Sequence, residues 1–493
     1  MNNGVWMNYP KLSEINPMYI LFTPAIVAFI IALIPTFKYH WPLSWDIYYH
    51  THMAQLYLES GLTLWDSLTY APFGRPIYYP PIFHYLLATI VTVFKVDVFL
   101  SSKYLQPILS FFLVLSFTYV GKKLYNWRVG VMAGFLLFFT VLFHRSMLPL
   151  PETLALILLP LALYFYFHAR EEKNWKYAFI AGLIGGLISL THSLTALMMV
   201  GVVISFTLTL KLRGEKIGQR CLGIFLGITL LLCSIWLLPL WLQHGYVFHN
   251  PQSVFQSPHD YFIIIIGTFG VPIIIFVSIW MINTIKNGFK GDYLKKMSKR
   301  EILILSWFLF ILILSNAYLI GISILADRIL NFAVFPAVIL AALGLEYLRS
   351  ISIKKRTIYP KLTTYLALLI IFAAVLSALF CAVSIKPMVN DSQLDLAQWF
   401  HENGDKKRVV MSLSEGIDPV IVSVSRQPVS TGGYHPGMVK VLNREMYYTG
   451  NYTKEDLIRD NIGYLVESSP MVHLDYFKLV YQNKDYKVWR VDI

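Results

Sequence analysis

The sequence predicts an α-helical membrane protein that crosses the bilayer many times and ends in a small α/β domain. Hydrophobic residues make up 56% of its 493 residues and charged residues only 14%, a composition typical of polytopic membrane proteins rather than soluble domains. Its apolar runs have the length of about 20 residues that an α-helix needs to cross a bilayer. After residue 385 the long apolar runs stop and charged residues return.

The apolar runs predict about 11 transmembrane helices. We expect them at residues 17–36, 104–120, 129–144, 152–168, 177–190, 194–211, 220–241, 261–283, 302–322, 329–347 and 362–384. The segment 79–94 is also apolar, but it is short and opens with Pro80 and Pro81. It is therefore expected to be a helix lying at the membrane interface rather than a span.

Basic loops predict the orientation of the chain, because Lys and Arg favour the cytoplasmic side. With the N-terminus in the cytoplasm, every predicted inner loop is basic: 121–128, 168–176, 211–220, 285–300 and 348–356. The predicted outer loops are not. The net charge of +13 is therefore explained by orientation, and we expect a multi-pass protein of the cell membrane that binds no nucleic acid.

An odd number of spans places the C-terminal end outside the cell. The predicted division is a membrane domain at 1–385, with a large first outer loop at 37–103, and an extracytoplasmic α/β domain at 386–493. Within the latter, Ser392 and Thr453 each precede an Asp by three residues, which is the pattern of a helix capping box. A hairpin is predicted around Asn483 and Lys484.

The first outer loop carries an unusual polar stretch, with Asp46, His50 and His52 among aromatic residues and Arg75 further on. Ser44 can cap a helix here, which puts Asp46 in the first turn, where the helix dipole favours its ionised form. An ionised carboxylate can accept a proton or bind a hard cation. His50 follows one turn later on the same face. The alternative interpretation is that Asp46 and His50 only stabilise the start of the helix.

Other polar residues also fall in predicted outer loops. Arg145 and Glu152 bracket the second loop, His192 lies in the third, and Arg328 lies in a later one. Each has a structural alternative: an acid at a helix N-terminus for Glu152, contacts with lipid headgroups for the arginines, and an interfacial side chain for His192. No charged residue lies in the middle of a predicted span, which argues against an ion-coupled transporter.

These features together resemble the C-type membrane glycosyltransferases, and in particular the oligosaccharyltransferase catalytic subunit and its prokaryotic relatives. One span leads into a long outer loop that begins with an acid, WDIYYH, and ends in the PP-x-F-H-x-L-L element from Pro80 to Leu87. A second outer motif follows as His144-Arg145-Ser146 and then Glu152. The sequence ADRILNF, which contains Arg328, is similar to the family's late arginine followed by a span.

The resemblance implies transfer of a sugar from a polyprenyl-phosphate-linked donor, with membrane lipid as the second partner. Asp46 is the expected catalytic residue, and Arg328, Arg145 and His192 are expected to bind the donor phosphate. Alternatively, Asp46 and Glu152, with His50, hold a divalent cation such as Mg²⁺ or Mn²⁺.

The chain departs from the oligosaccharyltransferase pattern in two ways. It has one acid, Glu152, in place of an acidic pair, and residues 386–493 lack a WWD-type motif. The acceptor is therefore left open as a glycan, a lipid or a protein. The rival functions are a flippase or exporter of lipid-linked glycans, an assembly or sensor protein, and a polymerase or ligase of surface glycans.

Overall fold

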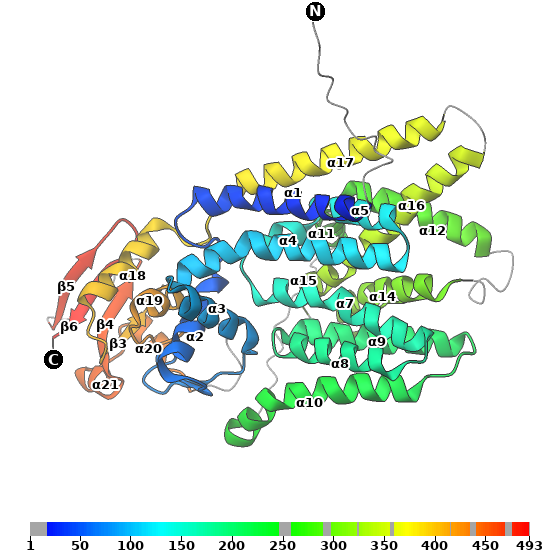
Figure 1. Ribbon diagram of the computed structural model, residues 1–493. Helices are drawn as coiled ribbons and strands as arrows, with labels where there is room; N and C mark the ends of the chain where they lie inside the picture. The colour runs from blue at the N-terminus through cyan, green and yellow to red at the C-terminus, as the bar shows by residue number, and fades with distance from the viewer. Residues whose placement is uncertain are drawn as a thin grey trace, which may run out of the picture.

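The computed structural model describes residues 17–245, 258–288, 297–322, 325–354, 359–414, 416–433, 440–468 and 476–492. Figure 1 shows long helices packed alongside one another, with a small sheet region at one end of the molecule. Two helices of the first outer loop, α2 (Asp46–Ser60) and α3 (Ile82–Phe94), lie at the same end as the sheet.

The described residues contain seven helices that are long and apolar enough to cross a membrane, or eight if one bent pair is a single span. The bent pair is α11 (Pro258–Phe269) and α12 (Val271–Gly288), which meet at an angle of 93° around Gly270. The seven are α1 (Pro17–Lys38), α4 (Val98–Leu124), α7 (Pro151–Glu171), α9 (Ser193–Leu212), α10 (Gln219–His244), the segment Ala326–Ile351 and α17 (Tyr359–Ser384). The protein is therefore a multi-pass membrane protein.

The predicted count of about 11 spans is not confirmed, because three predicted spans form shorter helices. Segment 129–144 is divided among α5 (Trp127–Leu136), the 3₁₀ turn η1 (Leu137–Phe139) and α6 (Val141–Ser146), which Thr140 caps. The other two short helices are α8 (Trp175–Ser189) and α14 (Lys299–Ser315). The 3₁₀ turn η2 (Ala317–Ile320) follows α14. Span length depends on where a helix breaks, which hydropathy does not reveal.

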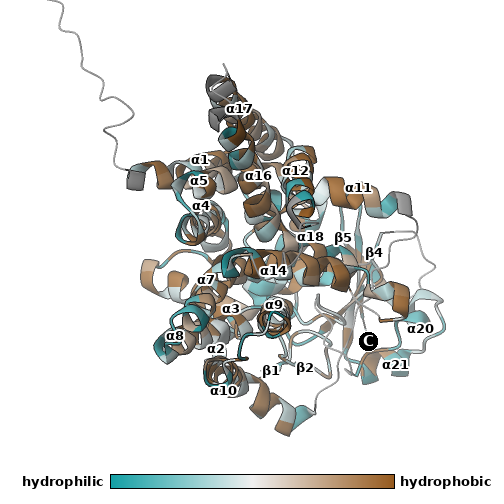
Figure 2. Cartoon of the chain, turned by 90° about the vertical axis from the view of Figure 1, so that its right-hand side faces the viewer, coloured by the Kyte–Doolittle hydropathy of each residue, from teal (hydrophilic) through white to brown (hydrophobic). Residues whose placement is uncertain are grey.

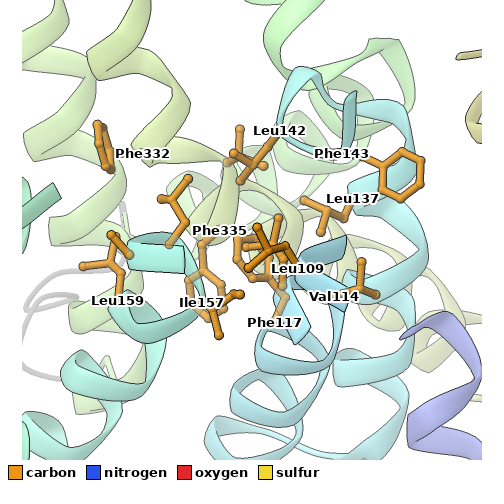
Figure 3. Packing of buried hydrophobic residues seen from close by; sticks show 14 of the residues in the cluster. Leu109, Val114, Phe117, Leu137, Leu142, Phe143, Ile157, Leu159, Phe332 and Phe335 are labelled. Atoms are coloured by element: carbon orange, nitrogen blue, oxygen red, sulfur yellow. The ribbon is translucent and has the colours of Figure 1, made fainter. Parts of the chain in front are cut away.

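The core of the helical part lies around α4. Figure 3 shows Leu109, Val114 and Phe117 of α4 packed near Ile157 and Leu159 of α7. Phe335 of α16 (Val334–Lys354) packs edge-on against Phe117, with ring centroids 4.9 Å apart. Outer helices such as α10 and α17 keep large apolar side chains exposed, and Figure 2 shows that the long helices consist largely of hydrophobic residues. Such a surface suits hydrocarbon rather than water.

Two short helices precede the span α16. These are α15 (Ala326–Leu330) and the 3₁₀ turn η3 (Asn331–Ala333). Arg328 lies on α15, near the beginning of the apolar segment Ala326–Ile351.

The first outer loop is folded rather than extended. A two-stranded hairpin, β1 (Trp65–Asp66) and β2 (Arg75–Pro76), joins α2 to α3. Helix α3 has 13 residues, too few to cross a bilayer, which agrees with its expected interfacial position. Asp97 then caps α4 by accepting hydrogen bonds from the amides of Phe99 and Leu100.

The C-terminal region is built on a four-stranded sheet of order β3-β4-β6-β5. Its strands are β3 (Val409–Ser412), β4 (Ile462–Glu467), β5 (Phe477–Gln482) and β6 (Lys487–Val491), of which β3 and β4 run parallel. Its helices are α18 (Asp391–Asn403), α19 (Asp418–Ser425), α20 (Arg444–Tyr448) and α21 (Lys454–Arg459). This arrangement agrees with the α/β region that the sequence predicts.

Local signals in this region are mostly confirmed. Strands β5 and β6 form the hairpin predicted around Asn483 and Lys484. Thr453 forms the predicted capping box of α21 with Asp456. The box predicted at Ser392 is wrong, because Asn390 caps α18 together with Gln393, two residues earlier. Asn, like Ser, accepts hydrogen bonds from the first amides of a helix, and here it precedes Ser392.

The first outer loop is fastened to the C-terminal region. Backbone hydrogen bonds join Ala71 N–H to the Val429 carbonyl and Val429 N–H to the Leu68 carbonyl. Val429 in turn forms a parallel bridge with Val410 of β3, so the outer loop extends the edge of the sheet. Arg426, which follows α19, pairs with Glu59 at the end of α2. We call this set of contacts the joint.

Candidate active site

Asp46 is the first residue of α2, as expected, but its local setting differs from the prediction. The N-cap is Trp45 rather than Ser44, although the Ser44 hydroxyl accepts a hydrogen bond of 3.2 Å from the Asp46 amide. The Trp45 ring donates to the Gly416 carbonyl at 2.6 Å, which fixes the start of α2 against the C-terminal region.

The carboxylate of Asp46 is accessible, although protein surrounds much of it. Its side chain is exposed, yet surrounding protein raises its pKa by desolvation. We call this setting, in which protein partly desolvates an accessible carboxylate, the recess. The helix dipole was expected to favour the ionised form, but burial outweighs the favourable charges of Arg328 and Arg145. A raised pKa makes Asp46 a better proton acceptor than an ordinary aspartate.

Arg145 and Glu152 form an ion pair across the second outer loop. Arg145 lies in α6 and Glu152 follows Pro151 at the start of α7, and Nη2 of the arginine bonds Oε2 of the glutamate. Glu152 is 7% exposed, and its Oε1 has no hydrogen-bond partner among the described residues. The positive charge of Arg145 is thus largely compensated before any substrate arrives.

His192 caps α9, and this contact determines its tautomer. Its Nδ1 accepts a hydrogen bond of 3.3 Å from the Thr195 amide. An amide only donates, so the imidazole proton must lie on Nε2. Burial lowers the pKa of His192 to about 4, so the ring is neutral at neutral pH. It can donate one hydrogen bond to a phosphate, but it does not add the positive charge that the sequence suggested.

Arg328 is a positively charged residue of the site, and unlike Arg145 it is not paired with a described carboxylate. It lies in α15 and is exposed. Among the described residues it forms no hydrogen bond or ion pair. Its charge nevertheless acts on Asp46, Glu152 and His192, which shows that its guanidinium lies near all three.

The structure therefore gathers residues that are far apart in the sequence. Asp46 is influenced by the charges of Arg145, Glu152 and Arg328, and His192 by those of the same three residues. They come from five separate elements: α2, α6, α7, the cap of α9 and α15. Such a set combines a proton acceptor, one unpaired cation and a neutral hydrogen-bond donor.

The residues do not fit the metal site suggested by the sequence. His50 is almost fully buried, at 4% exposure, and its Nδ1 lies 3.0 Å from Nε2 of His84. Glu152 is engaged by Arg145. Within the described ranges, no three His, Cys, Asp or Glu side chains are grouped so that they could hold a metal ion. A donor set of Asp46, Glu152 and His50 for Mg²⁺ or Mn²⁺ is therefore not formed.

His52 and Arg75 belong to the joint rather than to the recess. Asp66 accepts a hydrogen bond of 3.1 Å from His52 Nε2 and pairs with Arg75, and all three are buried. Arg426 donates to His52 Nδ1 at 2.6 Å. No local signal in the sequence points to Asp66 or Arg426, because residues so far apart in the chain come into contact only in the fold. The pairing of His84 with His50 likewise has no local signal in the sequence.

Comparisons with known proteins confirm the resemblance at the level of the fold. Residues 78–238 match the family of dolichyl-phosphate-mannose-protein mannosyltransferases. A search of curated protein sequences gives no match. Three solved structures of glycosyltransferases are similar to this chain at low sequence identity.

The first is the Archaeoglobus fulgidus oligosaccharyltransferase, described as a complex with Zn and sulfate. It gives a TM-score of 0.69 at 15% identity over 91% of this chain and 67% of that one. The second is ArnT from Cupriavidus metallidurans bound to undecaprenyl phosphate, with a TM-score of 0.61 at 13% identity over 96% and 97%. The third is the arabinofuranosyltransferase AftD from Mycobacteria, with a TM-score of 0.57 at 12% identity over 97% and 40%. The chain thus has the fold of C-type membrane glycosyltransferases.

Proposed function

We propose that this protein is a glycosyltransferase that moves a sugar from a polyprenyl-phosphate-linked donor to an acceptor at the outer membrane face, with inversion at the anomeric carbon. The observation that carries the proposal is the meeting of Asp46, a proton acceptor, with Arg328, an unpaired cation, in one recess. The resemblance to ArnT bound to undecaprenyl phosphate supports a donor of this class.

Arg328 binds the donor phosphate. Guanidinium keeps its charge at every relevant pH and can give two parallel hydrogen bonds to phosphate oxygens. Arg328 lies near the beginning of the apolar segment Ala326–Ile351. The phosphate therefore lies near headgroup level, while the lipid chain stays among the helices. Placing the charge at this boundary avoids moving it into hydrocarbon.

Asp46 acts on the acceptor. It takes the proton of an acceptor hydroxyl as the hydroxyl oxygen attacks the anomeric carbon. The bond between that carbon and the phosphate oxygen breaks, and the phosphate leaves with the electron pair. Attack from the face opposite the phosphate inverts the anomeric centre, which requires Asp46 and Arg328 to act on opposite sides of the sugar.

The remaining residues of the recess stabilise the leaving phosphate without adding net positive charge. His192 donates from Nε2 to a phosphate oxygen, and Glu152 holds Arg145 in place. No step passes through a metal ion, since the residues do not form a metal site. The acceptor is a hydroxyl group of a glycan, a lipid or a protein, and the extracytoplasmic C-terminal region at 386–493 lies next to it.

The test uses purified protein in lipid nanodiscs, radiolabelled undecaprenyl-phosphate sugars and a panel of acceptors. Asp46→Asn keeps the size of the side chain but removes the proton acceptor, and we expect transfer to fall by at least about a thousandfold, within the range found for loss of a catalytic base. Asp97→Asn is the matched control, because Asn caps α4 as well as Asp does. Transfer by Asp46→Asn at the parental rate would show that the assignment is wrong.

A flippase is the second candidate, favoured by one observation. Helices α11 and α12 form a pair broken by 93° at Gly270, and broken helices are common in transporters. Fluorescent undecaprenyl-phosphate sugar in proteoliposomes tests this function. Protein-dependent movement between leaflets that Asp46→Asn does not slow, without any transfer, would favour the flippase.

A further inference from the structure

A pair of buried histidines lies behind the recess and is not used by the scheme above. His50 follows Asp46 by one turn of α2, and His84 lies in α3. Their rings stack with centroids 5.2 Å apart, and Nδ1 of His50 is 3.0 Å from Nε2 of His84. His84 is 0% exposed and His50 is 4% exposed.

Both rings are neutral. Burial lowers the pKa of His84 to about 3 and that of His50 well below its ordinary value. The hydrogen bond between them therefore joins one N–H to one bare ring nitrogen. Two arrangements satisfy this condition, and they differ in where the other protons lie.

The surroundings of His84 distinguish the two arrangements. Its Nδ1 is buried and has no hydrogen-bond partner among the described residues, because the rings of Tyr49, Tyr57 and Tyr79 surround it at centroid distances of 5.6–6.2 Å. If His50 donated, His84 would carry its proton on this Nδ1. A buried N–H without an acceptor is rarer in proteins than an unused acceptor. His84 therefore donates from Nε2, and His50 keeps its proton on Nε2.

This tautomer places an N–H on Nε2 of His50, pointing away from His84. His50 Nε2 forms no hydrogen bond with any described residue, yet it is not among the buried side-chain atoms that lack a partner. Water or a ligand can therefore reach this N–H and supply its acceptor, which the buried Nδ1 of His84 does not allow. His50 shares a face of α2 with Asp46. His192 is one of the groups that lower the pKa of His50, which places this ring near the recess.

We propose that His50 Nε2–H donates to a hydroxyl oxygen of the transferred sugar, and that His84 is the positioning residue that holds His50 in this tautomer. The inference rests on the proposed function, because the sugar belongs to the donor described above. It assigns α2 two tasks one turn apart: proton acceptance at Asp46 and recognition of the sugar at His50.

The surroundings of His50 favour a sugar hydroxyl over the phosphate. The ring of Tyr79, which is partly exposed, lies edge-on to it with centroids 4.8 Å apart, and Phe83 lies at 5.6 Å. No arginine is among the groups whose charge acts on His50. Aromatic surface with a few neutral hydrogen-bonding groups suits a polar but uncharged ligand, whereas a phosphate requires cations.

The first test reads the tautomer directly and does not depend on activity. Protein labelled with ¹⁵N-histidine is studied by NMR in nanodiscs, and the His50 signals are identified by their loss in His50→Phe. At pH 7 we expect Nε2 of His50 to carry the proton and Nδ1 to be bare. Replacement of His84 by Leu removes the donor and should mix the two tautomers, whereas His84→Gln, whose amide can donate, should retain the parental one. A proton on Nδ1 of His50 in the parent would overturn the inference.

The second test measures the consequence for the sugar. With the undecaprenyl-phosphate sugar that supports transfer (mannose is tried first), kcat/KM should fall about tenfold in His84→Leu, the effect of one hydrogen bond, and recover in His84→Gln. Binding of undecaprenyl phosphate without sugar should stay unchanged in both, which shows that the fold and the phosphate site are intact. His40→Leu, at an exposed histidine outside the recess, is the matched control.

The outcomes separate this inference from the proposed function. If the parent transfers sugar and His84→Leu does so with parental kcat/KM, the role of His84 is wrong while the function stands. A parent that transfers no sugar refutes the proposed function, and with it the sugar as ligand of His50. Equal loss in His84→Leu and His84→Gln, together with weakened binding of undecaprenyl phosphate, would mean that His84 only maintains the fold.

Discussion

Removal of the Arg328 charge gives the sharpest test of how the recess binds phosphate. Five ionisable groups bear on it: Arg145 and Arg328 are positive, whereas Asp46, Glu152 and Asp327 are negative when ionised. Arg145 is paired with Glu152, so Arg328 is the cation left for the substrate. Arg328→Gln makes the recess one unit more negative and removes the guanidinium that we propose binds the donor phosphate.

The expected magnitude follows from the strength of a charged hydrogen bond. Such a bond contributes about 1.5–3 kcal/mol, which corresponds to a loss of binding of about 10- to 150-fold. The loss should be smaller in high salt, because exposed charges are screened, and Arg328 is exposed. The Kd for undecaprenyl phosphate and the KM for the donor should rise together.

A second substitution should restore part of this loss. Glu152→Gln releases Arg145 from its partner and returns the lost unit of charge, so the double variant Arg328→Gln/Glu152→Gln should bind phosphate more tightly than Arg328→Gln alone. Breaking a buried pair costs about 3–5 kcal/mol of stability, so thermal unfolding of each variant is measured alongside.

The assay is equilibrium binding of undecaprenyl phosphate to protein in nanodiscs at two salt concentrations. Arg349→Gln, near the C-terminal end of α16 where Arg349 pairs with Glu346, is the matched control and should bind as the parent does. The reasoning fails if Arg328→Gln binds as tightly as the parent, or if Glu152→Gln weakens the Arg328 variant further without unfolding it.

Three carboxyl groups give further tests through their titration. Because Arg328 lowers the pKa of Asp46 while burial raises it, the acid limb of kcat/KM should lie above pH 3.8 and move to higher pH in Arg328→Gln; an unmoved limb contradicts the role of Asp46 as base. His52 and Arg75 hold the pKa of Asp66 well below its ordinary value, so its stabilisation is complete above pH 3.8 and is lost as the pH falls below that value. Asp66→Asn should therefore cost about 3–5 kcal/mol at pH 7 and less in acid, and parental thermal unfolding at pH 7 would refute this. Burial raises the pKa of Asp418 to about 6, so the folded state retains a proton that the unfolded state releases above pH 3.8. Stability should fall as the pH rises from about 4 to 6, and this fall should be reduced in Asp418→Asn; an identical pH profile would show that Asp418 does not cause it.

The sequence could predict that the residues of the recess lie on one side of the membrane, because this depends on the order of spans and loops. Basic loops assign the sides of the membrane, and once the sides are assigned, Asp46, Arg145, Glu152, His192 and Arg328 all fall on one surface. Elements defined by local chemistry were also predictable, such as the hairpin of β5 and β6. These features depend on residue type and on spacing along the chain.

The pairings within the recess were not predictable, because they depend on distances between elements. The sequence does not show that Arg145 is neutralised by Glu152, or that the amide of Thr195 fixes the tautomer of His192. The same reason applies to the expected place of His50 in a metal site, since its Nδ1 lies 3.0 Å from His84. The predicted number of spans is not confirmed, because helix breaks such as the one at Thr140 leave the mean hydropathy almost unchanged.

The joint has a consequence for protein engineering. The edge of the C-terminal sheet continues into residues 68–71 through Val429. Arg426 donates hydrogen bonds to both Glu59 and His52. A chimaera that exchanges the C-terminal region with that of a relative, while keeping its own first loop, would leave His52 and Glu59 without Arg426. An exchange that transfers the first loop and the C-terminal region together preserves the contacts of the joint. These two distant stretches of chain therefore form a single transplantable module.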